Sequence, residues 1–232
     1  YLRQFPNGKY TLNAHFYLAE SLYKEGKYSE ANEHYTTVAT QPNNIFSEPA
    51  LSRASELTYN AQNYEPALEM FNRLETVANS KWNVLKAYTG QMRCNFHLNN
   101  LPNAIAAAEK VKKSDIANEA LTREADYITG KSYFELENLA QALPSLQKVS
   151  SDTKLEEGAE AKYLVAEIYF RQNKKTEAEK EIDDFIAKGT PYLFWLGKSF
   201  LLLSDIYLDN NQEFDAKHTL RSLIENYNND TD

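Results

Sequence analysis

Two Gly-Lys-Ser triplets, at residues 130–132 and 197–199, are the nearest approach in this sequence to a cofactor-binding motif. In a phosphate-binding loop such a triplet holds phosphate oxygens with backbone N–H groups and the lysine. The loop also needs a glycine five residues earlier, where this chain has Ala125 and Tyr192. It must follow a strand, whereas both triplets lie in helical patterns. We therefore predict no nucleotide and no other cofactor.

The spacing of the remaining reactive side chains does not match a metal-binding or catalytic motif. The four histidines share no i, i+4 pairing, and the single cysteine, Cys94, has no second cysteine to join it, so we predict no metal site. These histidines are His15, His34, His97 and His218. Adjacent acids such as Glu156 and Glu157 point to different sides of a helix. No Gly-x-Ser-x-Gly elbow is present, and no acid/base pair converges, so we predict no catalytic residues and a protein that is not an enzyme.

Composition limits the classes of partner. The 232 residues are 42% hydrophobic and 25% charged, which is enough apolar content for a sizeable core. A net charge of -8 opposes binding to nucleic-acid phosphates and anionic lipid headgroups. The longest apolar stretch, residues 194–203, is shorter than the roughly 18 residues that span a bilayer. We predict neither nucleic acid nor direct membrane insertion, and the absence of a starting Met favours a piece of a longer protein.

Small residues recur along the whole chain and indicate the elements that would position any site. One alanine returns with the long, nearly constant period of a repeat protein, at Ala31, Ala67, Ala104, Ala142, Ala178 and Ala216. A second small residue precedes each of these by a constant interval, at Ala14, Ala50, Ala87, Ala125, Ala161 and Ser199. A third, five residues after the second, is small in five of six cases. Such positions are expected where two helices cross closely.

Each repeat divides into two stretches with apolar residues at helical spacing, joined by a short polar link rich in Gly and Asn. We expect first helices near 13–25, 49–61, 86–98, 124–136, 160–172 and 197–209. Second helices are expected near 28–40, 64–77, 101–112, 139–149, 175–187 and 213–226. One such hairpin cannot bury its apolar stripe alone, so neighbouring hairpins must stack. The pattern predicts an all-α chain without strands.

Residues 18–31, followed by Tyr35, Val38 and Pro42, resemble a tetratricopeptide repeat (TPR) almost residue for residue. Residues 127–149 and 163–185 are similar but lack the Gly of the link, and 87–111 is the most degenerate copy. The resemblance implies a right-handed α-α superhelical solenoid of about six TPR-type hairpins. Its expected divisions are 1–12 as the end of a preceding repeat, then 13–48, 49–85, 86–122, 123–159, 160–196 and 197–232. The period is longer than is usual in the family, which implies lengthened helices or loops.

Two further resemblances bear on location. Residues 5–10 resemble repeats of periplasmic outer-membrane-assembly lipoproteins and of a related cell-envelope division coordinator. Residues 211–227 are similar to repeats common in long proteins of Bacteroidetes bacteria. Both resemblances imply a bacterial cell envelope, in the periplasm or associated with the outer membrane.

First helices line the concave side of a stacked hairpin array, so their inward stripe is the expected partner-binding groove. Aromatic residues recur on that stripe, and aromatic rings are frequent at protein interfaces, although such a stripe can also pack between repeats. Charges of both signs accompany the rings and favour a partner of mixed or basic charge. The expected groove residues are Phe16, Glu20, Tyr23, Glu56, Tyr59, Arg93, Phe96, Tyr127, Lys131, Phe134, Tyr163, Glu167 and Phe170.

These observations favour a non-catalytic scaffold that holds a protein or peptide in the groove. The Lys/Asn pattern with which some TPR domains clamp a C-terminal carboxylate is missing, because the matching positions hold Phe16 with Glu20 and Ser52 with Glu56. The alternative function is a structural spacer or self-association arm of a larger envelope protein, which leaves a homo-oligomer open.

Overall fold

The computed structural model describes residues 1–227, and these residues form twelve α-helices and no strand. The last five residues of the expected sixth repeat, 228–232, lie outside the described residues. In chain order the helices are α1 (Thr11–Lys24), α2 (Tyr28–Ala39), α3 (Ser47–Asn60), α4 (Tyr64–Val77), α5 (Lys81–His97), α6 (Leu101–Lys112), α7 (Glu119–Glu135), α8 (Leu139–Val149), α9 (Glu156–Arg171), α10 (Lys175–Lys188), α11 (Leu193–Asp209) and α12 (Glu213–Asn226). Every predicted helix is present, and the all-α class is confirmed.

First helices begin two to five residues earlier than predicted, whereas second helices match the prediction to within one residue. The helices α5, α7 and α11 have 17 residues each, and α9 has 16. The prediction placed each start one or two residues before the small residue of the repeat, and in α5, α7, α9 and α11 it missed the turn before it.

Every hairpin link ends its first helix with one residue in the left-handed region, at φ between 57° and 77°. These residues are Gly26, Gln62, Asn99, Glu137, Asn173 and Asn211. The N–H group after each of them closes a bond to the carbonyl five residues back, as from Lys27 to Leu22 at 2.9 Å. This bond satisfies a carbonyl that the helix end would leave unpaired. The polar links rich in Gly and Asn therefore end the first helices, and Gln62 and Glu137 adopt the same backbone with bulkier side chains.

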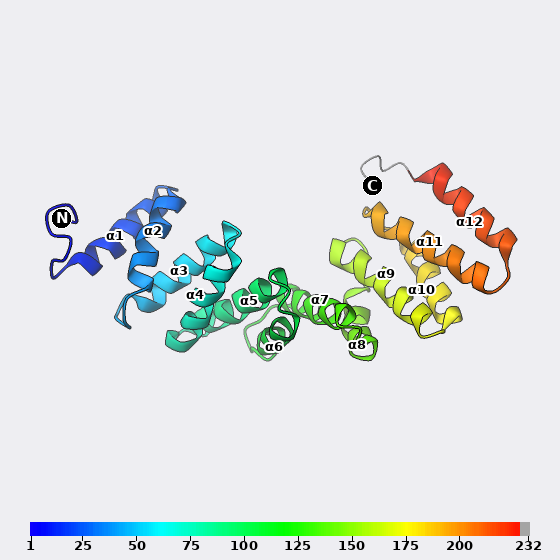
Figure 1. Ribbon diagram of the computed structural model, residues 1–232, viewed down its shortest axis with the longest axis horizontal. Helices are drawn as coiled ribbons and strands as arrows, with labels where there is room; N and C mark the ends of the chain where they lie inside the picture. Colours follow the sequence, from blue (N-terminus) through cyan, green and yellow to red (C-terminus); the bar gives the residue numbers. More distant parts are fainter. Residues whose placement is uncertain (228–232) are drawn as a thin grey trace. The chain divides into compact units, whose positions relative to one another are not determined.

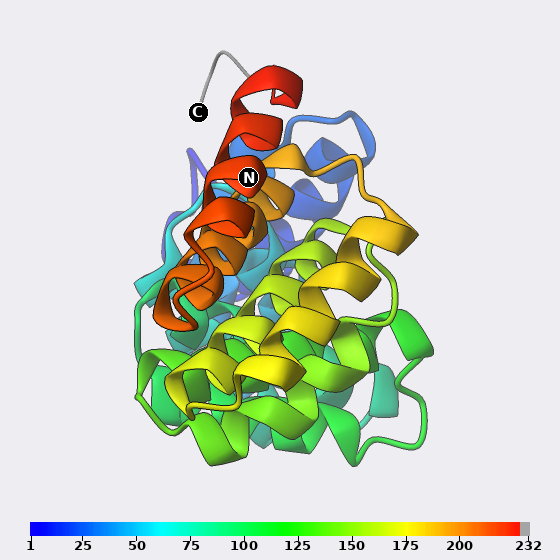
Figure 2. The ribbon, with the colours of Figure 1, turned by 90° about the vertical axis from the view of Figure 1, so that its right-hand side faces the viewer.

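The chain divides into two compact units, Tyr1–Ile128 and Thr129–Asp232. In the first unit, α1 pairs with α2, α3 with α4 and α5 with α6, and consecutive hairpins pack through α2 on α3 and α4 on α5 (Figure 1). In the second unit, α9 pairs with α10 and α11 with α12, and α8 packs on α9 (Figure 2). Each unit is thus a stack of helical hairpins, which is the TPR solenoid architecture that the repeats predict.

The cores of both units form where the recurring small residues let helices approach. The alanines of the second helices, from Ala31 to Ala216, are at most 1% exposed. Large side chains of the same helices fill the space beside them, including Tyr35, Leu146 and Phe185, each fully buried. Complete burial of one such side chain contributes about 1.5–3 kcal/mol. Within residues 1–227, no helix is both long and apolar enough to cross a membrane.

Candidate functional site

Charged side chains on successive first helices pair with one another across the repeats. We number each first helix from its small residue (Ala14, Ala50, Ala87, Ala125, Ala161 or Ser199), which we call the register residue. Three ion pairs join position +6 of one repeat to position -1 of the next. They are Glu56–Lys86 at 2.9 Å, Arg93–Glu124 at 2.6 Å and Lys131–Glu160 at 2.9 Å. The charges expected to face a partner at Glu56, Arg93 and Lys131 are therefore engaged within the chain.

Arg93 and Glu124 make the most directional of these contacts. The Nε and Nη2 atoms of Arg93 each donate to one carboxylate oxygen of Glu124 at 2.6 Å. Such a two-point pair is both stronger and geometrically more demanding than a single ionic contact. The hydrogen bonds to Glu124 raise the pKa of Arg93 and outweigh the opposite effect of burial. The pair fixes α7 against α5 within the first unit.

Phe16, Glu20 and Tyr23, all on α1, meet around the buried Tyr35 of α2. The hydroxyl of Tyr35 donates to Glu20 at 2.5 Å, and burial together with this bond raises the pKa of Tyr35. The rings of Phe16 and Tyr23 contact Tyr35 edge-on, with centroids 6.2 and 6.4 Å away. The guanidinium of Arg53 lies 4.3 Å from the Tyr23 ring. These predicted residues consequently pack between helices of the first two repeats.

Glu56, Tyr59 and Arg93 instead line an open hollow of about 430 Å³ between α3 and α5. Phe71 and Leu85 belong to the apolar part of its lining. The further lining residues are Asn60, Trp82, Asn83, Lys86, Thr89 and Gly90. A Cβ on Gly90 would lie 2.3 Å from the Phe71 ring, so glycine is required for this close crossing.

Trp82 is the exposed aromatic residue of this pocket, and sequence reasoning missed it. Its side chain is 69% exposed, which is unusual for a large aromatic ring. It stands at position -5, on the extra helical turn that the predicted boundaries left out of α5. The available signal was the four-residue spacing from Trp82 to Lys86, which places both on one face of a helix.

The remaining predicted rings of the first unit are largely internal. Phe96 and Tyr127 pack against a cluster that includes Met92, Val111 and Ile128. Their half-buried rings therefore help to hold α5, α6 and α7 together. They leave less surface for a partner than the sequence pattern suggested.

In the second unit, Arg171 contacts two predicted groove residues, Phe134 and Glu167, and also Glu137. Its guanidinium lies 4.8 Å from the ring of Phe134 and donates to Glu167 at 2.9 Å and to Glu137 at 3.2 Å. Glu167 is therefore also engaged within the chain. Tyr163 is 8% exposed, and burial followed by its hydrogen bond to Glu167 raises the pKa of Tyr163.

A second open hollow, of about 300 Å³, lies between α9 and α11. It is lined by the predicted residues Tyr163, Glu167 and Phe170. The other lining residues are Arg171, Lys198, Leu201, Leu202 and Asp205. The ammonium of Lys198 lies 4.6 Å from the ring of Tyr163 and also faces the rings of Phe194 and Trp195. Both pockets are lined by positions +6, +9 and +10 of one repeat and by positions -1, +2, +3 and +6 of the next.

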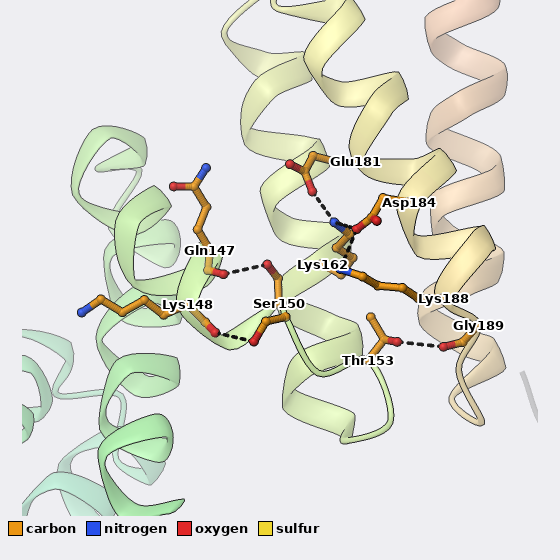
Figure 3. A network of polar contacts seen from close by, with 10 residues as sticks. Gln147, Lys148, Ser150, Thr153, Lys162, Glu181, Asp184, Lys188 and Gly189 are labelled. Carbon is orange, nitrogen blue, oxygen red and sulfur yellow. Dashed lines mark hydrogen bonds and ion pairs between the residues drawn. The ribbon is translucent and has the colours of Figure 1, made fainter. Parts of the chain in front are cut away.

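A buried cation on α9 is held by two carboxylates of α10 (Figure 3). Lys162 of α9 is 5% exposed, and its ammonium lies between the carboxylates of Glu181 and Asp184 on α10. Asp184 also pairs with Lys188 at 2.8 Å. Nearby, the hydroxyl of Thr153 donates to the carbonyl of Gly189 at 2.7 Å and ties the preceding loop to the end of α10. Spacing in the sequence did not reveal this network.

His15 and His34, treated as unrelated in the sequence, meet inside the first hairpin. Their Nδ1 atoms are 2.9 Å apart, so one ring donates a hydrogen bond to the other. Among residues 1–227, no three His, Cys, Asp or Glu side chains come together as metal ligands. Cys94 is fully buried, and burial raises the pKa of its thiol to about 12 despite Arg93 nearby.

Comparison with known proteins agrees with the architecture. Two stretches, residues 13–44 and 127–192, match the tetratricopeptide repeat family. Among solved structures, YrrB, described as a TPR protein with an unusual peptide-binding site, shares 18% identity at a TM-score of 0.62, covering 84% of this chain and 92% of its own. BtubC from P. vanneervenii shares 10% identity at a TM-score of 0.55, covering 94% of both chains. No curated protein matches the chain. The chain therefore contains tetratricopeptide repeats, and its helical hairpins have the fold of that family.

Proposed function

We propose that this chain is a non-catalytic scaffold that binds a peptide or a partner protein along the faces of its first helices. TPR proteins serve as protein-interaction scaffolds, and YrrB, which shares the fold, is described as having a peptide-binding site. The observation that carries the proposal is the pair of open pockets, which contain six of the thirteen predicted groove residues. Exposed Trp82 in the first pocket supplies the kind of ring that anchors partners at interfaces.

The nature of the pockets supports recognition through apolar contacts more than through charge. Glu56, Arg93 and Glu167 each have an ion-pair partner inside the chain. A partner that competed for these charges would have to break existing pairs. Burying Trp82 and Tyr59 under a partner would instead remove apolar surface from water, which favours binding by roughly 25 cal/mol per Å².

Selection of short random peptides on the immobilised chain tests the proposal. We expect enriched peptides whose affinity falls at least tenfold in Trp82→Ala. Phe214→Ala is the matched control, because Phe214 is 80% exposed on α12 and lines neither pocket. Failure to enrich any peptide, or equal binding by Trp82→Ala and the parent, would refute the proposal.

Self-association is the second candidate function, favoured by apolar side chains exposed on the last hairpin. Leu208 is 50% exposed, and Ile224 is 78% exposed. Sedimentation at increasing concentration should then reveal a dimer that Ile224→Lys abolishes. A monomer at all concentrations would contradict self-association and leave the scaffold as the proposed function.

We extend the proposal to a bacterial envelope on the resemblance of residues 5–10 to periplasmic repeats and of residues 211–227 to repeats of Bacteroidetes proteins. Fractionation of the source cells tests this setting. Recovery of the protein with cytoplasmic markers would contradict it.

A further inference from the structure

The two pockets share a set of four chemically matched positions. Position +6 of the preceding repeat is a glutamate, position +9 an aromatic ring, position -1 of the next repeat a lysine and position -5 an aromatic ring. In the first unit these are Glu56, Tyr59, Lys86 and Trp82; in the second they are Glu167, Phe170, Lys198 and Phe194. In each pocket the glutamate, the ring at +9 and the lysine line the hollow. Trp82 also lines the first pocket, whereas Phe194 accompanies the second through Lys198, whose ammonium lies 5.8 Å from the Phe194 ring.

The repeat pattern alone does not produce this set. Between the pockets, the charge pairs at the same positions are reversed, with Arg93–Glu124 and Lys131–Glu160. Position -5 there holds Ala120 or Glu156 in place of an aromatic ring. The matched set therefore distinguishes two places in the chain from the repeats between them.

We infer that the chain carries two equivalent subsites, one in each unit, and that each takes one large apolar side chain of a peptide. This inference rests on the proposed function and specifies the ligand. The charges of the first pocket are already compensated, by Glu56–Lys86 and by Arg93–Glu124. In the second pocket Glu167 pairs with Arg171, and the ammonium of Lys198 faces the rings of Tyr163, Phe194 and Trp195. A charged side chain entering the first pocket would lose hydration without gaining a free partner of opposite sign. An apolar side chain would cover rings that water now contacts.

The pockets differ in size and at two lining positions. Position +2 is Thr89 in the first pocket and Leu201 in the second, and position +3 is Gly90 in the first and Leu202 in the second. The first hollow measures about 430 Å³ and the second about 300 Å³. The first subsite should therefore prefer an aromatic side chain, and the second should prefer leucine.

The two tryptophans of the chain allow each subsite to be observed separately. Trp82 lines the first pocket, and the ring of Trp195 lies 5.8 Å from that of Tyr163 and 5.4 Å from the Lys198 ammonium at the second. With 5-fluorotryptophan in the full chain, ¹⁹F NMR gives two resonances, assigned with Trp82→Phe and Trp195→Phe. The probes are the blocked tripeptides Ac-Ala-Phe-Ala-NH2 and Ac-Ala-Leu-Ala-NH2. Their matched controls carry Glu or Lys at the central position.

We expect both resonances to shift saturably with the apolar probes and not with the charged ones. The phenylalanine probe should bind more tightly at Trp82 and the leucine probe more tightly at Trp195. Thr89→Arg and Leu201→Arg are matched variants at position +2 that fill one pocket each with a side chain reaching solvent. Each should weaken binding at its own tryptophan at least tenfold and leave the other unchanged.

Three outcomes would overturn the inference. A response of one tryptophan only would eliminate the second subsite, and equal shifts with the charged probes would eliminate the apolar class. Silence of both tryptophans, while library-selected peptides still bind the parent and lose affinity in Trp82→Ala, would refute the subsites and leave the proposed function standing. If the selected peptides also failed to bind, both proposals would fall together.

Discussion

Breaking the Lys162 network from its two sides should destabilise the second unit by different amounts. The double variant Glu181→Gln with Asp184→Asn keeps the lysine and removes both carboxylate charges. Lys162→Met keeps the carboxylates and replaces the lysine with an unbranched apolar side chain. Comparing the two variants shows how much the loss of stability depends on whether the charge left unpaired is buried or exposed to water.

The magnitudes follow from burial. Lys162 is 5% exposed, whereas the side chains of Glu181 and Asp184 are 25% and 42% exposed. Removing both carboxylates leaves a buried ammonium without a counter-charge, which costs about 3–5 kcal/mol. Removing the ammonium leaves carboxylates that water can reach, one of which still pairs with Lys188. We expect a loss of about 1 kcal/mol for Lys162→Met, because the carboxylates left behind can be hydrated and the methionine fills the space of the lysine stem.

Urea unfolding followed by Trp195 fluorescence measures this difference. The background variant Trp82→Phe removes the signal of the first unit, which is necessary because a repeat array can unfold in parts. The slope of the unfolding free energy against urea should be the same in all variants, so that midpoints report stability.

Asp184 adds a pH signature. Hydrogen bonds from Lys162 and Lys188 hold the pKa of its carboxyl below the ordinary value and outweigh burial. The parent should therefore lose this contribution as pH falls through the lowered pKa of Asp184, and the double variant should not. A loss in Lys162→Met equal to or greater than that in the double variant would refute the reasoning.

Three further predictions concern other parts of the fold. Burial, and then the charge of His34, lowers the pKa of His15. The free energy of unfolding should therefore decrease as pH falls below about 6.5, and His34→Gln should reduce this dependence. Urea midpoints measured at pH 8 and pH 5.5 check both expectations. Gln62→Gly should stabilise by about 0.5 kcal/mol, because relief of the left-handed backbone at φ 61° exceeds the added chain entropy; a lower melting temperature would contradict this. Ala166→Leu should cost about 1–3 kcal/mol by overpacking a site that is 1% exposed, and a melting temperature equal to the parent would exclude a close helix crossing there.

The helices and their pairing could be predicted because their determinants are local. An α-helix forms by bonds between residues four apart, and each link ends a helix through one left-handed residue, so spacing and residue type suffice. The small residues, such as Ala67 and Ala178, indicated the close crossings directly. The starts of the first helices were missed because the added turn, as at residues 81–85 of α5, precedes the register residue and carries no repeated small side chain.

The identity of the exposed residues depended on packing between repeats. Glu56 and Lys86 belong to different repeats and become partners only because α3 and α5 lie side by side. The same stacking buries Tyr163 and leaves Trp82 exposed, although both belong to aromatic positions on first helices. Sequence periodicity specifies the face of a helix, but the neighbouring helices decide which side chains of that face remain in contact with water. The tertiary structure alone therefore assigned charges to internal pairs and aromatic rings to two open pockets.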